Sequence, residues 1–200
     1  MMIEAMADSL YLSYWLRNFS ALSVLRAYGK MLTAFPYSPQ NPAHSLLRIE
    51  AVSTSEPPLL ERPFADPLDP QAVLQCANEF QHPDCAYVLE TWWGLWQFRK
   101  DWELRPARVT LSCYGPEFSD IPLLGSNTPP EHLRIDCGLD SSFLPWPDDP
   151  ASAYYTRSNL RGLLRLVHQL DEVLSVEQRL LWSESGESFA GKLADAIQNL

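Results

Sequence analysis

The sequence contains no apolar run long enough to cross a membrane. Its longest uncharged stretch, residues 31–47, is interrupted by Pro36, Pro39 and Pro42, whereas a membrane-spanning helix needs about 20 consecutive, mostly apolar residues. The start of the chain, MMIEAMADSLYLSYWL, has no basic segment and carries two acidic residues, which is not the pattern of a secretory signal. We therefore expect a soluble, cytoplasmic protein that does not bind membranes.

Basic residues are also scarce. The chain has 15 Lys and Arg against 25 Asp and Glu, a formal net charge of -10 at pH 7. Such a charge repels the phosphate backbone of nucleic acids and the headgroups of anionic lipids. This balance excludes non-specific nucleic-acid binding and favours protein partners.

Cysteines and histidines number only four each. Cys76, His82 and Cys85 come nearest to a metal site, but no second close pair follows, and a structural zinc site needs two. Cys113 and Cys137 lie in apolar, strand-like surroundings, where a thiol is normally an inert small hydrophobe. We expect four reduced thiols, no metal and no cofactor.

Two short motifs near the end of the chain resemble catalytic loops without completing them. Residues 186–193, GESFAGKL, have the spacing of a phosphate-binding loop, but Leu193 stands where that loop has Ser or Thr. Ser188 lies in a Gly-x-Ser-x-Ala pattern, yet no histidine follows His168 to complete a hydrolase triad. Sequence spacing therefore assigns no catalytic residue.

Apolar residues make up 46% of the chain, which is enough for a packed interior. A single core usually serves about 100 to 200 residues, so we expect one domain, residues 1–200. Residues 53–70 contain five prolines, which cannot donate to a regular strand ladder. We interpret this segment as an extended connection; the alternative is a division into 1–52 and 69–200 around it.

Hydrophobic periodicity predicts an α+β fold. Alternating apolar and polar positions predict strands, and apolar positions three and four residues apart predict helices. The expected fold is an antiparallel or mixed sheet of about five strands packed with three to four helices, with two ferredoxin-like halves as a finer possibility. The predicted strands are 9–17, 46–52, 85–98, 108–114 and 133–137, and the predicted helices are 20–35, 69–80, 149–174 and 187–199.

The strand at 85–98 is unusually aromatic. Period two places Trp93 on one face of the strand with Leu89, and Trp92 and Trp96 on the other. Both faces therefore have to be covered, either by the protein's own helices or by another chain. Together with Trp102, these three tryptophans are our predicted protein-binding residues.

The helix predicted at 149–174 carries the one ordered charge pattern. Arg157, Arg161, Arg165 and His168 recur at steps of four, four and three residues and so form one stripe. Stacked guanidinium groups bind carboxylates and phosphates well, which makes these four residues a predicted anion-binding site. In a chain with a net charge of -10, we nevertheless favour the interpretation that they pair with the protein's own acids, for example Asp136, Asp140 or Asp148.

Two functions fit this sequence. The first is a non-catalytic intracellular binding protein that engages a protein partner or a second copy of itself through an aromatic, acidic surface. The second is a small hydrolase-like enzyme whose anionic substrate is held by Arg157, Arg161 and Arg165. An enzyme should show a concave site where a titratable residue meets the arginines, and a binding protein an exposed aromatic area.

Overall fold

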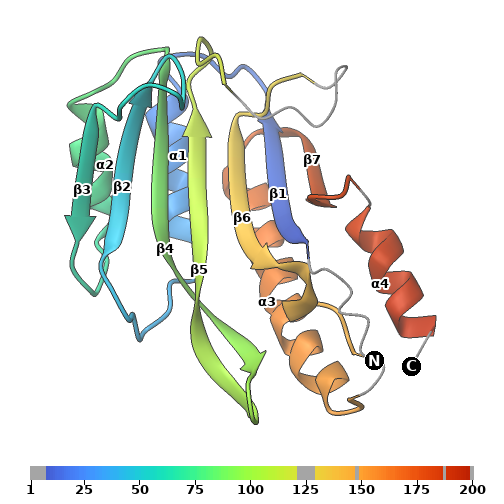
Figure 1. Cartoon of the computed structure of the whole chain (residues 1–200). Helices are drawn as coiled ribbons and strands as arrows, with labels where there is room; N and C mark the ends of the chain where they lie inside the picture. The colour runs from blue at the N-terminus through green and yellow to red at the C-terminus, as the bar shows by residue number, and fades with distance from the viewer. Residues whose placement is uncertain (1–7, 121–128, 147–148, 187, 199–200) are drawn as a thin grey trace.

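Seven strands form one antiparallel sheet in a computed structural model that describes residues 8–120, 129–146, 149–186 and 188–198. The strand order is β3-β2-β4-β5-β6-β1-β7 (Figure 1). The expected α+β class is confirmed. The strands are β1 Ser9–Leu16, β2 Ser45–Ala51, β3 Leu60–Phe64, β4 Cys85–Phe98, β5 Trp102–Tyr114, β6 Leu133–Leu139 and β7 Val176–Ser183; the α-helices are α1 Val24–Ala34, α2 Pro70–Asn78, α3 Ser152–Val173 and α4 Phe189–Gln198, with a short 3-10 helix at Asp140–Ser142.

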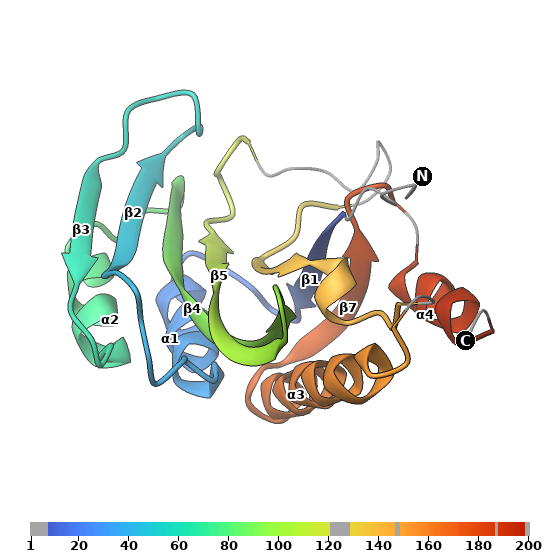
Figure 2. The same ribbon diagram turned by 60° about the horizontal axis from the view of Figure 1, so that its bottom comes forward.

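The helices α1, α2 and α3 cover one face of the sheet, and α4 lies beside β7 (Figure 2). The main core fills the space between that face and the three helices. Alternate residues of the central strands, such as Leu12, Leu89 and Leu111, point into it and meet Met31 of α1 and Leu166 of α3. Within the described residues, no helix covers the opposite face of the sheet.

The sheet has two more strands than the sequence predicts, and all its pairs are antiparallel. β3 lies inside the proline-rich segment and pairs with β2, with Pro63 opposite Leu46. A proline is tolerated there because β3 is an edge strand, with no further strand to bond on its outer side. The two ferredoxin-like halves do not appear in the described part of the chain, where the strands follow one another in a single sheet.

Strands that precede residues 53–70 in the chain pair directly with strands that follow them. β1 lies between β6 and β7, and β2 pairs with β4.

No helix in the described ranges is long and apolar enough to cross a membrane.

The β4–β5 hairpin is the longest feature of the sheet. Its pairing continues from Ala86 opposite Tyr114 to Phe98 opposite Trp102, whereas β2 pairs with β4 only as far as Glu90. The distal half of the hairpin therefore extends past β2 and curls over the side of α3 (Figures 1 and 2). This curl brings Trp96 and Trp102 into contact with Tyr155 of α3.

His132 joins the loop before β6 to the end of β1. Its Nδ1 atom accepts a hydrogen bond of 2.8 Å from the backbone N–H of Leu16, and its ring stacks on Phe19 with ring centroids 4.1 Å apart. An accepting Nδ1 carries no proton, so the ring is neutral in this arrangement. Burial lowers the pKa of His132, although the charge of Glu177 acts in the opposite direction.

We predict that His132 makes the protein less stable as the pH falls from 7 to 5. Its pKa is lower in the folded state than in the unfolded state, so the unfolded chain binds more protons in this range, and stability is lost as the pH falls. A His132→Asn variant keeps an acceptor near the Nδ1 position but does not titrate. The free energy of unfolding, measured with urea at several pH values, should change with pH more steeply in the parent, by up to about 1.4 kcal/mol per pH unit. Equal pH dependence in the two proteins would contradict the prediction.

Candidate functional site

The structure places the four predicted tryptophans in three different surroundings. Trp93 is 4% exposed and packs in the main core, edge to face against Phe35. Trp92 is half-buried on the other face of β4, where its indole N–H donates to the carbonyl of Ala43. Trp96 and Trp102 lie further along the hairpin. The predicted division of Trp92 and Trp93 between two faces is confirmed, and the binding role of all four residues stays a prediction.

Trp96 and Trp102 belong to a group of aromatic rings that we call the aromatic cluster. Trp102 stacks on Tyr155 of α3 with ring centroids 4.9 Å apart, and its indole N–H donates to Asp149 at 2.9 Å. The rings thus fix the curled hairpin against the start of α3. The cluster consists of Trp96, Phe98, Trp102, Trp146, Tyr154 and Tyr155.

Part of this region remains open to solvent. Phe98 is 44% exposed, Leu104 is 56% exposed and Tyr154 is 73% exposed. Large apolar side chains that are exposed next to one another are a usual feature of interaction sites. The hairpin and the start of α3 therefore present apolar surface that the described part of the chain does not cover.

The arginine stripe lies on the exposed side of α3. Arg157, Arg161 and Arg165 are exposed and make no hydrogen bond or ion pair with any described residue. His168 lies 3.3 Å from Glu172 of the same helix. The three guanidinium groups are therefore available to an anion.

The internal acids that we considered as partners for this stripe are engaged elsewhere or lie outside the described residues. Asp136 accepts from the backbone N–H of Gly138. Asp140 accepts from Lys192 at 2.9 Å. Asp148 lies outside the described ranges. Self-neutralisation by Asp136 or Asp140 is thus not observed.

A cavity of about 430 Å³ lies between the curled hairpin and α3. We call it the hairpin cavity. Trp93 and Trp96 contribute to its wall, and Arg165 contributes from α3, so the cavity joins residues of both predicted sites. Its complete lining is Pro36, Trp93, Gly94, Leu95, Trp96, Leu104, Ser158, Asn159, Gly162, Arg165, Leu166 and Gln169.

Asn159 holds the two walls of the hairpin cavity together. Its Oδ1 atom accepts from the backbone N–H of Trp96 at 2.9 Å, and its Nδ2 atom donates to the carbonyl of Trp96 at 2.9 Å. The same Nδ2 donates to the carbonyl of Ser142 at 2.8 Å. The carboxamide therefore takes the place of a neighbouring strand at the free edge of β4. Our sequence reasoning missed this residue; the available signal was a polar side chain on the buried stripe of α3.

The described lining of the hairpin cavity is mostly apolar and carries one formal charge, that of Arg165. Its lining, within the described chain, includes no Asp, Glu, His, Cys or Lys, the groups that usually act as general acids, bases or charged nucleophiles. The cavity thus offers apolar walls, a few polar groups and one fixed positive charge.

The cysteines lie away from this cavity and are buried. Burial raises the pKa of Cys85 to about 11, and raises those of Cys113 and Cys137 still further. Thiols with raised pKa values are weak nucleophiles at neutral pH. His82, which we considered together with Cys76 and Cys85 as a metal ligand, lies 2.5 Å from Asp84, and the described residues contain no group of three that could hold a metal.

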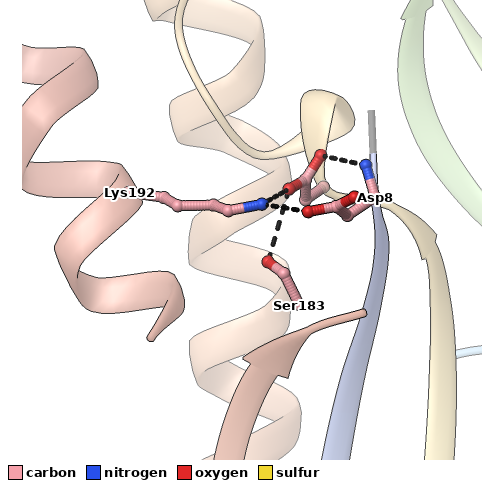
Figure 3. A network of polar contacts seen from close by, with 4 residues as sticks. Asp8, Ser183 and Lys192 are labelled. Atoms are coloured by element: carbon pink, nitrogen blue, oxygen red, sulfur yellow. Dashed lines mark hydrogen bonds and ion pairs between the residues drawn. The ribbon is translucent and has the colours of Figure 1, made fainter. Parts of the chain in front are cut away.

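Lys192, the lysine of the phosphate-loop-like segment, contacts carboxylates instead (Figure 3). Its Nζ atom donates to Asp8 at 2.5 Å and to Asp140 at 2.9 Å, and Ser183 also donates to Asp140. Burial lowers the pKa of Lys192, but its hydrogen bonds to Asp8 and Asp140 outweigh this and raise it. The network joins α4 to the start of β1, to the end of β6 and to β7, so we assign it a structural role.

No known protein family, no curated protein and no solved structure matches this chain. Its function must therefore be inferred from the geometry of the described residues. Two features bear on it most directly, the hairpin cavity and the unpaired arginines beside it.

Proposed function

We propose that this chain is a non-catalytic binding protein whose partner is another protein. The observation that carries the proposal is the hairpin cavity, in which Trp93 and Trp96 form apolar walls and Arg165 supplies the only formal charge in the described lining. Pockets with apolar walls and a few polar groups are typical binding sites. Aromatic residues and arginine are also enriched among the residues that dominate protein–protein affinity.

The chemistry of this surface suggests the chemistry of the partner. An apolar side chain of the partner would enter the hairpin cavity, while the exposed Phe98 and Leu104 would extend the contact outside it. An acidic side chain of the partner would meet Arg161 and Arg165, which have no partner among the described residues. We therefore propose a partner segment that combines apolar and acidic residues. We expected the binding surface to be acidic as well as aromatic. The aromatic surface proposed here is instead bordered by Arg161 and Arg165.

A second copy of this chain is a special case of the same proposal. The chain carries a net charge of -10, so one copy has acidic surface to offer to the α3 arginines of another, and a homodimer is compatible with the same site. We propose neither a nucleic acid nor a membrane as a partner, because a chain with a net charge of -10 is repelled by phosphate backbones and by anionic lipid headgroups. We also propose no cofactor. A cytoplasmic location is part of the same proposal.

The hydrolase-like alternative would use Arg157, Arg161 and Arg165 to hold an anionic substrate. It would also need a general base or nucleophile near them. Ser158 lines the hairpin cavity, but none of the described lining residues could act as the general base that would activate its hydroxyl group. The geometry therefore favours binding over catalysis.

Selection from a displayed library of random peptides tests the proposed function. The full chain should enrich peptides that carry a large apolar residue close to Asp or Glu. An Arg165→Glu variant should bind the enriched peptides at least about tenfold more weakly, because a reversed charge repels an acidic segment. Ser158→Phe, which places a ring in the cavity, should weaken the same peptides by blocking entry of the apolar anchor.

Arg26→Glu is the matched control, since Arg26 is an exposed arginine on α1 that does not line the hairpin cavity. It should leave peptide binding unchanged. Failure to enrich any peptide, or equal binding by the parent and both site variants, would overturn the proposal. Sizing chromatography with light scattering tests whether the partner is a second copy of this chain. A dimer in the parent and a monomer in Arg165→Glu would identify a second copy as the partner.

A further inference from the structure

A second cavity lies at the end of the sheet where β1 ends and β7 begins. Its volume is about 250 Å³, and we call it the basic pocket. The turn after β1, one side of α1 and the turn between α3 and β7 form its walls, and the backbone N–H of Arg17 joins the two turns by donating to the carbonyl of Ser175 at 2.8 Å. The basic pocket shares no lining residue with the hairpin cavity.

Three positive charges line the basic pocket. Arg17 comes from the turn after β1, and Arg26 and Lys30 lie one turn apart on the same side of α1. Its lining contains no carboxylate among the described residues. This concentration of cations stands out in a chain whose acids outnumber its bases by 25 to 15.

The cationic side chains of this pocket make few hydrogen bonds or ion pairs with the rest of the described chain. Arg17 and Arg26 make no side-chain hydrogen bond or ion pair with any described residue. Lys30 donates one hydrogen bond, of 2.6 Å, to the carbonyl of Val173 at the end of α3. That bond fixes the position of its ammonium group and leaves two of its three N–H donors for a ligand.

The acids of α3 and β7 that are closest in sequence to the turn at 174–175 interact with other groups. Asp171 lies 2.9 Å from Arg179, and Glu172 lies 3.3 Å from His168. Glu177 acts electrostatically on His132. The positive potential of the basic pocket is thus not cancelled by a bonded carboxylate.

We propose that the basic pocket binds a phosphate dianion, either free or carried by a small molecule. Two guanidinium groups offer paired N–H donors that match phosphate oxygens, and an ammonium group adds a compact charge. Asn18, whose φ of 54° lies in the left-handed region that asparagine tolerates, adds a carboxamide on the same side. This site is separate from the proposed protein-binding surface, so either proposal can fail without the other.

Titration calorimetry with the full chain tests the basic pocket, with inorganic phosphate and glycerol 3-phosphate as the two probes. Sodium chloride keeps the ionic strength constant throughout, because exposed charges are screened by salt. Saturable binding of at least one probe is expected, and the tighter probe shows whether free phosphate or a phosphomonoester is preferred. Arg17→Gln and Arg26→Gln should each weaken binding at least about tenfold, since each removes a charge-assisted hydrogen-bonding group.

Arg99→Gln is the matched control, because Arg99 is an exposed arginine just after β4 that lines neither the basic pocket nor the hairpin cavity. It should bind both probes like the parent. Absence of saturable heat up to roughly 10 mM of both probes, a range that covers the weak affinities of small anions, would overturn the proposal. An equal loss in Arg99→Gln and Arg26→Gln would overturn it as well, because the charge of the whole surface would then account for the binding.

Discussion

Replacement of Gly115 by alanine should destabilise the protein by roughly 3 kcal/mol. Gly115 directly follows β5 and is buried. A Cβ atom at this position would lie 2.8 Å from the carbonyl oxygen of Cys85 and closer still to that of Pro83. Both are backbone atoms and cannot rotate away. The chain before β4 would therefore have to move, which weakens the 2.8 Å hydrogen bond from the N–H of Gly115 to Cys85.

Gly162→Ala is the matched control for this prediction. Gly162 lies within α3, where the nearest atom to an added Cβ is Cζ2 of Trp93 at 3.7 Å, an ordinary contact. Alanine is the better helix former by about 1 kcal/mol, so this variant should be slightly more stable than the parent. Urea unfolding of both variants at one pH gives the comparison. An unchanged free energy of unfolding in Gly115→Ala would show that the two strand ends are not held as closely as the structure has them.

Elements with strong local signals were predicted close to their observed bounds. The strand predicted at 85–98 is β4, and the helix predicted at 149–174 contains α3. At α2, the predicted cap and first residue are both observed: Asp69 accepts from the backbone N–H of Gln71, and Pro70 begins the helix. Periodicity and capping are properties of the nearby sequence, so a single chain is enough to read them.

The two strands that the sequence analysis missed are both edge strands. An edge strand packs less of its surface, so its sequence needs less apolar alternation. In β3, Pro63 argued against a strand, although an edge position tolerates it. In β7, Glu177, Gln178 and Arg179 are exposed in succession, so no period of two appears there. The position of a strand at the edge depends on the whole sheet, which no local window contains.

The candidate site was predictable as residue types but not as an arrangement. Alternation correctly placed Trp92 and Trp93 on opposite faces of β4. Nothing local to the sequence, however, indicates that β4 and β5 curl towards α3, so that Trp96 and Arg165 line the same cavity. That convergence depends on where β2 stops pairing with β4, after Glu90, and is therefore a tertiary property.

Replacement of Asn159 by alanine should destabilise the protein by roughly 3 kcal/mol, because it removes three hydrogen bonds and leaves partly buried backbone groups without partners. Asn159 is 3% exposed, and its carboxamide bonds both backbone groups of Trp96 and the carbonyl of Ser142. Without it, the curled hairpin loses these hydrogen bonds and is held against α3 by the ring contacts of the aromatic cluster. Urea unfolding measures the loss of stability, and collisional quenching of tryptophan fluorescence should increase as the hairpin loosens.

Ser158→Ala is the matched control, since Ser158 precedes Asn159 on α3 and its side chain makes no hydrogen bond with any described residue. Its free energy of unfolding should stay within about 0.5 kcal/mol of the parent value. If Asn159→Ala were equally mild, the hairpin would be held by the aromatic cluster alone.

Asn159→Asp separates the hydrogen bonds of this residue from its packing, because aspartate has nearly the same shape. An ionised carboxylate still accepts from the N–H of Trp96 but faces the carbonyl oxygens of Trp96 and Ser142, to which it cannot donate. Burial and these two oxygens favour the protonated form, so the pKa of the new carboxyl group should be higher in the folded than in the unfolded state. A raised pKa stabilises the folded state at low pH, and that stability is lost as the pH rises. The free energy of unfolding of Asn159→Asp should therefore fall further below the parent value as the pH rises from 4 to 7. The difference between Asn159→Ala and the parent should stay constant over the same range. A pH-independent deficit in both variants would mean that the carboxamide fills space at α3 without supplying the edge bonds of β4.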